Sequence, residues 1–318
     1  DHAAVAARFG VQSNFGLILV GPPGVGKTMF AGAVCNHLEA SGRPTFFLNV
    51  KPGELRGMYY GQAESRIREL FRFARSAPGT VVIFMDELES FGVRGDGQGI
   101  DGRVLAALLA ELSGLEPTDN IFVIAATNRI DLCDEALTRK GRFGDSIITI
   151  PRPDAGAARQ IVAKHLDPAL PYGAHGKDDT EVHGRDAIIE AAVSHVYDTA
   201  HGYGSLAVVV FSDAERCEIV PRDVVSGALL AGALDQAREA AALRDIARIE
   251  SGATSPEYGL LVEDVLAALD DAFDAEAVKL ATPAVARRVL DIAEAGQIVR
   301  VEPTRSRRSR RHRFLRAA

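Results

Sequence analysis

The chain has 318 residues, of which 47% are apolar and 25% are charged, and its formal net charge is -7. This is the composition of an ordinary folded protein, and it excludes a disordered chain, a collagen-like chain and a coiled-coil rod. No run approaches the roughly 20 apolar residues that a membrane-spanning helix needs. The three cysteines are too few and too scattered for a disulfide framework, and this cysteine usage indicates a cytoplasmic protein. Because the first residue is Asp1 rather than Met, we expect a fragment that lacks an N-terminal part.

The first half of the sequence alternates short apolar runs with helical segments, which is the pattern of βαβ units on a parallel sheet. Strands are expected at Leu17–Val20, Thr45–Val50, Thr80–Met85, Asn120–Ala125 and Ser146–Ile150, with helices beginning near Gly26, Gln62 and Asp101. Several runs are apolar without alternation, as in strands that are covered on both faces. The sequence therefore predicts an α/β domain over residues 1–152, built on a parallel sheet.

Beyond Pro153 the sequence becomes rich in alanine and helical in pattern. Helices are expected at Ala155–Leu166, Asp186–His201, Arg222–Leu243 and Leu260–Phe273. A β-hairpin interrupts them, with strands Ser205–Phe211 and Arg216–Val220, and a short strand follows at Gln297–Val301. We therefore expect residues 153–303 to form a smaller, mostly helical domain that carries an inserted β-hairpin.

Residues 304–318 form a basic tail that we expect to be disordered. Its last fourteen residues hold seven arginines and no acid, so the rest of the chain has a net charge of -14. Such an acidic body repels phosphate backbones, which argues against general binding of nucleic acid. The tail alone is compatible with a solvated segment or with an arm for nucleic acid or an acidic partner.

The clearest motif lies between the first strand and the first helix. The run Gly21-Pro22-Pro23-Gly24-Val25-Gly26-Lys27-Thr28 matches the phosphate-loop pattern G-x-x-x-x-G-K-[ST]. The glycines let backbone N–H groups turn toward a β-phosphate, and the helix N-terminus adds its dipole. Lys27 is expected to reach the β- and γ-phosphates and the Thr28 hydroxyl to ligate Mg²⁺, which predicts a site for ATP with magnesium.

Two other strand ends carry polar residues. The apolar run Val81–Met85 ends in Asp86, placed to hold the Mg²⁺ shell, and Glu87, placed to polarise the attacking water. The second acid favours steady hydrolysis over a binding switch. Asn128 follows the fourth strand, at the edge where ligands bind in open α/β sheets, and it is expected to hydrogen-bond the γ-phosphate or the lytic water unless it is only a turn residue.

Together with the segment Asp131–Phe143, these motifs resemble an AAA+ ATPase of the unfoldase clade. The resemblance implies that Arg139 and Arg142 project into the nucleotide site of the neighbouring subunit as arginine fingers, the alternative being surface salt bridges. It also implies that the element Ser226-Gly227-Ala228, with Gly227 and Ala228 at the start of a helix, packs on the adenine.

The segment Tyr59-Tyr60-Gly61 resembles the central-pore loop of that clade, which has an aromatic residue, a hydrophobic residue and glycine. The resemblance implies that Tyr59 grips polypeptide, that Tyr60 is the hydrophobic neighbour and that Gly61 is the hinge. Two tyrosines packed beneath a helix are the structural alternative. Gly92–Gly102 corresponds to the second pore loop.

Within the clade, the hairpin in the small domain and the long helix after Ser226 look most like bacterial proteasomal ATPases of the ARC/Mpa type. The resemblance implies a homo-hexameric protein unfoldase that hydrolyses Mg·ATP and feeds a proteasome-like protease. The ending Arg313–Ala318 lacks the Gln-Tyr-Leu-type tail with which such ATPases dock onto the proteasome core. The alternatives are a protease-independent segregase or disaggregase and, in another class, a nucleotide-gated nucleic-acid-binding module.

Overall fold

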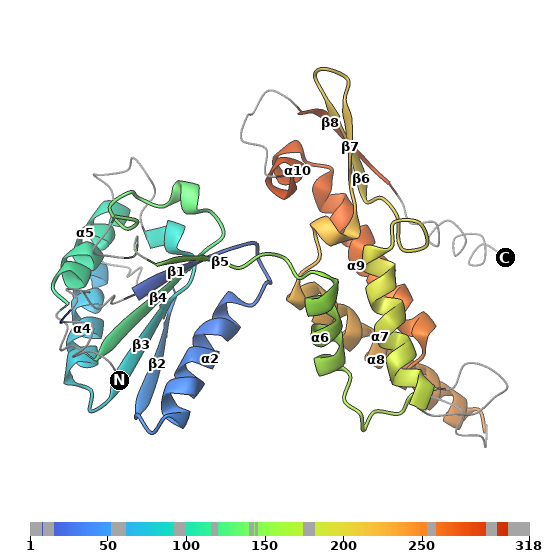
Figure 1. The fold of residues 1–318 in the computed structure, drawn as a ribbon, viewed down its shortest axis with the longest axis horizontal. Coiled ribbons are helices and arrows are strands. Elements are labelled where there is room, and N and C mark those ends of the chain that lie inside the picture. Colours follow the sequence, from blue (N-terminus) through green and yellow to red (C-terminus); the bar gives the residue numbers. More distant parts are fainter. Residues whose placement is uncertain are drawn as a thin grey trace. The chain divides into compact units, whose positions relative to one another are not determined.

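The computed structural model describes residues 16–51, 62–91, 100–115, 120–139, 146–173, 182–252, 259–290 and 298–304, together with Arg8 and Phe143. The chain divides into two compact units, Asp1–Pro151 and Arg152–Ala318 (Figure 1). Each unit has hydrophobic core residues of its own. The first unit is built on a parallel sheet, and the second is mainly helical.

The first unit contains a five-stranded parallel sheet with the strand order β2-β3-β4-β1-β5. Its strands are β1 (Gly16–Val20), β2 (Thr45–Val50), β3 (Thr80–Met85), β4 (Ile121–Thr127) and β5 (Ile147–Thr149). In register, Ile18 of β1 lies opposite Ala125 of β4, and Ile83 of β3 lies opposite Val123 of β4. Strand β4 therefore separates β1 from β3, although it follows both in the sequence.

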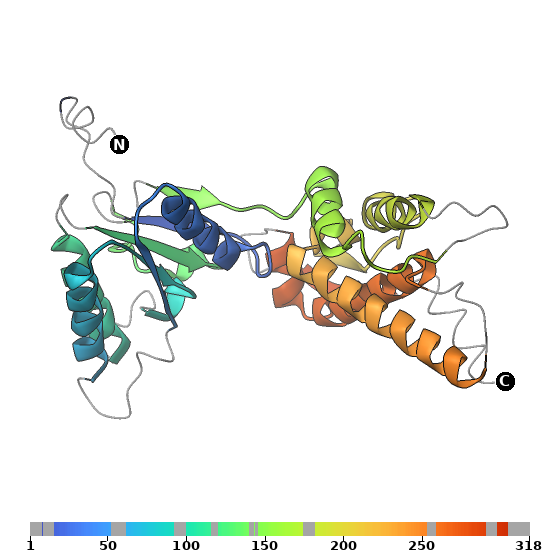
Figure 2. The ribbon, with the colours of Figure 1, turned by 90° about the horizontal axis from the view of Figure 1, so that it is seen from below.

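Helices cover both faces of this sheet (Figure 2). They are α2 (Lys27–Ala40) on one face and α4 (Gln62–Ser76) and α5 (Ile100–Ser113) on the other. Successive residues of β3 point to opposite faces, so Ile83 packs in the core that includes Ile67 of α4, whereas Phe84 packs in the core that includes Ala31 of α2. This double coverage explains why the central strands β1, β3 and β4 are apolar without alternation, and it confirms the predicted α/β fold class.

The second unit contains five helices among its described residues: α6 (Ala155–His165), α7 (Val182–Tyr197), α8 (Gly227–Glu250), α9 (Val262–Leu280) and α10 (Pro283–Val289). Their apolar faces share one core, in which Phe273 of α9 and Leu206, just before the first strand of this unit, are fully buried. None of the helices in the described ranges of the chain has the length and apolar content needed to cross a membrane.

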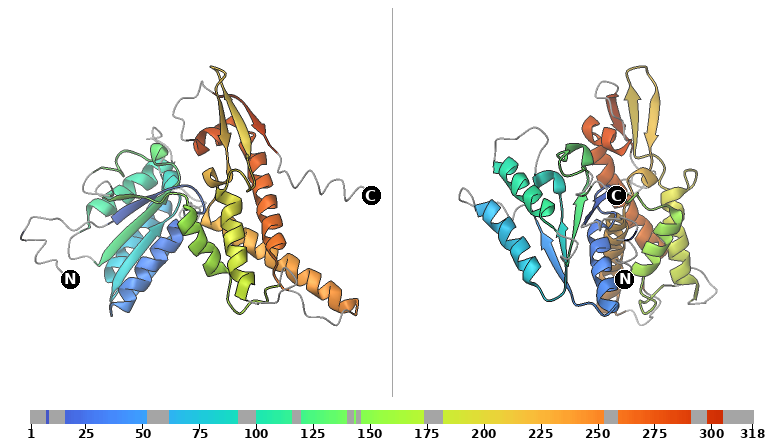
Figure 3. Two further views of the ribbon diagram at one scale, coloured as in Figure 1. Left: turned by 45° about the vertical axis from the view of Figure 1, so that its right-hand side comes forward. Right: turned by 60° about the vertical axis from the view of Figure 1, so that its left-hand side comes forward.

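A small antiparallel sheet with the order β7-β6-β8 belongs to the second unit (Figure 3). Its strands are β6 (Ala207–Phe211), β7 (Arg216–Ile219) and β8 (Ile298–Pro303). The predicted hairpin of β6 and β7 is confirmed, and β8 adds a third strand, with Val301 opposite Val209. The sequence predicted a short strand at this place but not its partner, because the pairing depends on how the intervening helices fold back.

Helix α8 begins later than the expected Arg222. Residues Pro221–Asp223 form a 3-10 turn, η3, and the buried Ser226 caps α8 by accepting a hydrogen bond from the Leu229 N–H at 3.2 Å. A serine cap satisfies an amide at the helix start that otherwise has no partner within the helix. Gly227 is therefore the first residue of the helix.

The ends of the other helices also differ from expectation. Helix α7 ends at Tyr197 rather than His201, and α9 continues to Leu280 rather than ending at Phe273. Helix α10, which was not predicted, follows with Pro283 in its first turn. Proline is well suited to that place because the first helical N–H has no acceptor within the helix.

Candidate functional site

The loop between β1 and α2 contains the glycine-rich motif, and its glycines are required by the backbone. Gly24 has a φ of 78° and Gly26 a φ of 98°, in the left-handed region that other residues rarely adopt. A Cβ on Gly21 would lie 2.3 Å from the carbonyl oxygen of Ile150. The motif therefore forms a tight backbone cradle at the N-terminus of α2, a place that favours anions.

Lys27, the first residue of α2, is only 8% exposed. Its Nζ donates to the carbonyl oxygens of Gly21 at 2.7 Å and Pro22 at 2.8 Å, and to Oδ1 of Asn128 at 2.7 Å. Burial lowers the pKa of the Lys27 ammonium, whereas the negative charges of Asp86 and Glu89 act to raise that pKa. An anionic phosphate oxygen would be a stronger acceptor than the three neutral oxygens that now hold the ammonium.

Two carboxylates follow the end of β3 in different surroundings. Asp86 is half-buried, and its Oδ1 accepts a hydrogen bond of 2.9 Å from the Glu87 N–H. Glu87 is exposed and has a φ of 52°, in the left-handed region. A positive φ is uncommon outside glycine, and strained residues of this kind cluster at functional sites. The two acids therefore differ in exposure and in backbone conformation, and their separate roles stay predictions.

The sheet order places the end of β4 between these two groups. The N–H of Gly21 donates to the carbonyl oxygen of Thr127 at 3.2 Å, which joins the glycine loop to β4. The next residue, Asn128, meets Lys27 as described above. The structure therefore brings together the loop, the acidic strand end and the asparagine, as expected where parallel strands end at one edge of a sheet.

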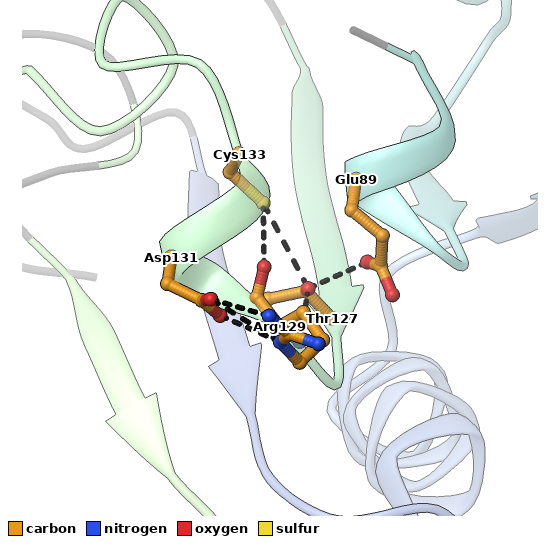
Figure 4. Close-up of polar contacts among 5 residues, drawn as sticks. All are labelled: Glu89, Thr127, Arg129, Asp131 and Cys133. Atoms are coloured by element: carbon orange, nitrogen blue, oxygen red, sulfur yellow. Dashed lines mark hydrogen bonds and ion pairs between the residues drawn. The ribbon is translucent and has the colours of Figure 1, made fainter. Parts of the chain in front are cut away.

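A second group of polar side chains at this edge was not anticipated from the sequence (Figure 4). Thr127 is 1% exposed, and its Oγ1 donates to Oε2 of Glu89 at 2.5 Å and accepts from the Arg129 N–H at 2.9 Å. The Arg129 guanidinium pairs with Asp131, with 2.7 Å between Nη2 and Oδ2. Cys133 packs beside them, and burial raises the pKa of its thiol to about 11. The sequence feature that could have indicated this group is Glu89, a further acid that follows the Asp86-Glu87 pair.

The donor atoms of this site fit a nucleotide with a magnesium ion. The hydroxyl of Thr28 and the carboxylate of Asp86 are hard oxygen ligands of the kind that Mg²⁺ prefers. The glycine cradle, the Lys27 ammonium and the helix N-terminus together suit the negative charge of phosphates. The residues present are thus compatible with the expected pair of ATP and Mg²⁺.

The remaining predicted residues are less fully described. Arg139 is exposed and follows the buried Leu137, while Gly227 and Ala228 form the first turn of α8. Arg142, Tyr59, Tyr60 and Gly61 lie outside the described residues, as do positions 92–99 of the expected second pore loop. The roles of all these residues stay predictions.

Two family models match the chain, one on each side of residue 152. The ATPase family associated with various cellular activities (AAA) matches residues 17–152, and the lid domain of the AAA+ ATPase ARC matches residues 153–312. Both matches agree with the motifs and the fold described above.

Several curated proteins are similar over most of the chain. An AAA ATPase forming ring-shaped complexes from Micrococcus luteus is 38% identical over 288 residues, covering 86% of this chain and 48% of that protein. A protein of the same name from Corynebacterium urealyticum is 37% identical over 292 residues, covering 84% and 53%. A proteasome-associated ATPase from Acidothermus cellulolyticus is 36% identical over 277 residues, covering 81% and 46%. The chain spans about half the length of these relatives.

Proposed function

The chain belongs to the AAA family of ATPases and carries an ARC-type lid domain, and from this premise we propose that it hydrolyses Mg·ATP within a homo-hexameric ring that unfolds and translocates proteins. The observation that carries the ATP-binding part of the proposal is the position of Lys27. Its buried ammonium is bonded both to the glycine loop after β1 and to Asn128 after β4, so two strand ends contribute to one anion-binding point. The names of the similar ring-forming and proteasome-associated ATPases support the assembly and a proteasome core particle as partner.

In the proposed mechanism, different residues of one subunit bind the phosphates, orient and deprotonate the water, and hold the metal ion. Lys27 binds the β- and γ-phosphate oxygens, and Asn128 orients the γ-phosphate or the attacking water. Glu87 accepts a proton from that water, a task that suits an exposed carboxylate beside the site. Thr28 and Asp86 would hold the Mg²⁺ ion, which when bound offsets the negative charge of the phosphates.

The neighbouring subunit supplies the second half of the proposed site. Arg139 and Arg142 extend from that subunit toward the γ-phosphate, where a guanidinium stabilises the charge of the transition state. Only these two arginines are assigned to the neighbouring subunit.

Gly227 and Ala228, at the start of α8 in the small domain, are proposed to pack on the adenine, because a glycine lets the backbone approach a planar base closely.

A cytoplasmic location is also part of the proposal, supported by three cysteines that are all free thiols.

The proposed substrate contact is the pore loop, in which Tyr59 holds extended polypeptide while Tyr60 and Gly61 support its movement. Replacing Tyr59 with alanine removes the grip but no nucleotide contact. We therefore expect ATP hydrolysis to stay within about threefold of wild type while unfolding of a stable tagged protein falls at least about tenfold, since loss of a favourable contact of about 1.4 kcal/mol changes a rate tenfold.

The test measures ATP hydrolysis and substrate unfolding on the same preparation of the assembled protein. Tyr60→Ala is the matched comparison, and we expect a smaller effect on unfolding. Equal loss of both activities in Tyr59→Ala would make Tyr59 a structural residue of the ATPase domain. Retention of both activities would remove the main support for an unfoldase.

A further inference from the structure

One carboxylate at the edge of the sheet has no role in the chemistry proposed above. Glu89 lies in the short turn η1 (Leu88–Phe91) that follows β3, and it is half-buried. Its Oε2 accepts the hydroxyl proton of Thr127 across 2.5 Å. A hydroxyl bonded to a carboxylate at this distance makes a short, charge-assisted hydrogen bond, which is stronger than one between neutral groups.

Thr127 is held from several directions at once (Figure 4). Besides the bond to Glu89, its Oγ1 accepts from the Arg129 N–H at 2.9 Å, and its carbonyl oxygen accepts from the Gly21 N–H at 3.2 Å. The side chain is 1% exposed, so water cannot replace a lost partner easily. The contact with Glu89 is therefore one of several that fix the end of β4, and it is a side-chain contact that reaches across from the segment after β3.

The position of Thr127 determines where the next side chain lies. Asn128 directly follows it, and Oδ1 of Asn128 accepts from Nζ of Lys27 at 2.7 Å. A small displacement of Thr127 would move the amide of Asn128 and the loop backbone at Gly21 together. In positioned catalysis, a shift of about 1 Å can cost a large part of the rate.

The charge of Glu89 acts in the same direction. Together with Asp86, it raises the pKa of Lys27, which burial otherwise lowers. A negative charge at this point therefore helps to keep the ammonium protonated and ready for an anionic phosphate.

We propose that Glu89 is a positioning residue for ATP hydrolysis, which holds Thr127 and through it orients Asn128 and the phosphate loop. Glu89 acts through Thr127 rather than on the nucleotide. The inference rests on the proposed catalytic role of Asn128, and the experiment below separates the two.

The first part of the test compares variants that remove the contact with variants that retain it. Glu89→Ala and Thr127→Val lose the hydrogen bond, so we expect kcat for ATP to fall about tenfold while KM stays within about threefold. Thr127→Ser keeps the hydroxyl and the carboxylate partner, and we expect it to retain most of the turnover. Glu89→Gln keeps an acceptor but loses the charge, and we expect its turnover to lie between those of Thr127→Ser and Glu89→Ala. Glu111→Ala is the control, because that carboxylate pairs with Arg75 between α5 and α4 instead.

The second part places Glu89→Ala in an Asn128→Ala background, measured on the assembled protein with circular dichroism as a check of folding. If Glu89 acts through Asn128, the double variant loses no more turnover than Asn128→Ala alone. A full additional loss would overturn the inference, as would wild-type turnover in both Glu89→Ala and Thr127→Val. If Asn128→Ala itself turns over normally, the proposed role of Asn128 fails, and the inference fails with it. Should Glu89→Ala not fold, Thr127→Val carries the same comparison.

Discussion

At the scale of single residues, the candidate site contains a buried lysine whose ammonium group has close polar partners. Burial of a charge is costly unless hydrogen bonds and opposite charges compensate for it. Lys27 has three oxygen acceptors within 2.8 Å, and Asp86 and Glu89 oppose the effect of burial on its pKa. The side chain is therefore already ordered, which would lower the cost of ordering it for the proposed contact with a phosphate.

Substitutions of Lys27 and Glu87 should separate binding of the nucleotide from its hydrolysis. Glu87→Gln keeps the cradle and removes the base, so ATP should bind within about threefold of wild-type affinity while kcat falls about 100-fold or more. Lys27→Ala should instead weaken ATP binding about tenfold or more, because a charge-assisted contact to phosphate is lost. Equilibrium binding of a fluorescent ATP analogue and steady-state hydrolysis distinguish the two, and normal turnover in Glu87→Gln would refute the proposed base.

At the scale of elements, α8 and α9 of the second unit are joined by polar contacts as well as by their core. Arg244 of α8 donates from Nη1 to Oδ1 of Asp264 at 2.5 Å and from Nη2 to the carbonyl oxygen of Gly259 at 2.6 Å. The other carboxylate oxygen of Asp264 accepts from the Leu261 N–H at 2.9 Å, at the start of α9. One aspartate thus both caps α9 and connects it to α8.

Replacing Asp264 with alanine should lower the free energy of unfolding of the second unit by about 2 kcal/mol, since a cap and a charged hydrogen bond are lost together. Urea denaturation followed by circular dichroism measures the change. Glu276→Ala is the control: its carboxylate pairs with Lys279 on the surface of the same helix, and such pairs contribute at most about 1 kcal/mol. Equal effects of the two substitutions would contradict the assigned capping role.

At the scale of the whole molecule, the two units have separate cores. The buried core residues of the first unit lie between Leu17 and Phe143, and those of the second lie between Ala158 and Ala286. The third strand of the small sheet, β8, also pairs within the second unit. A unit that buries its own apolar surface has the main requirement for folding alone.

We therefore expect residues 152–304, produced without the first unit, to give a helical circular dichroism spectrum and one cooperative unfolding transition. Phe273→Ala in this fragment should destabilise it by about 3–5 kcal/mol, because the ring is fully buried in its core. A fragment that shows no cooperative transition would indicate that the second unit depends on the first for stability.

The sequence alone determined the α/β class, the strands of the first unit, the phosphate loop and the hairpin of the second unit. All of these are local patterns: an apolar run of strand length, a turn between two such runs, or glycines and a lysine at fixed spacing. It also predicted Lys27 and Asn128, each on its own, as site residues. The physical requirements of such local patterns, for example the positive φ of Gly26, involve only a few neighbouring residues.

The tertiary structure alone decided which distant residues meet. Thr127 bonds Glu89, 38 positions away in the chain, and Val301 pairs with Val209, because the order of the strands and the packing of the helices bring them together. The sequence shows the acid after the Asp-Glu pair and the strand that contains Val301, but it does not show which residue each one meets, since any acid or hydroxyl can stand at a strand end and any short apolar run can add to a sheet edge. The contacts that fix Asn128 and Lys27 in place therefore became visible only once the sheet was assembled.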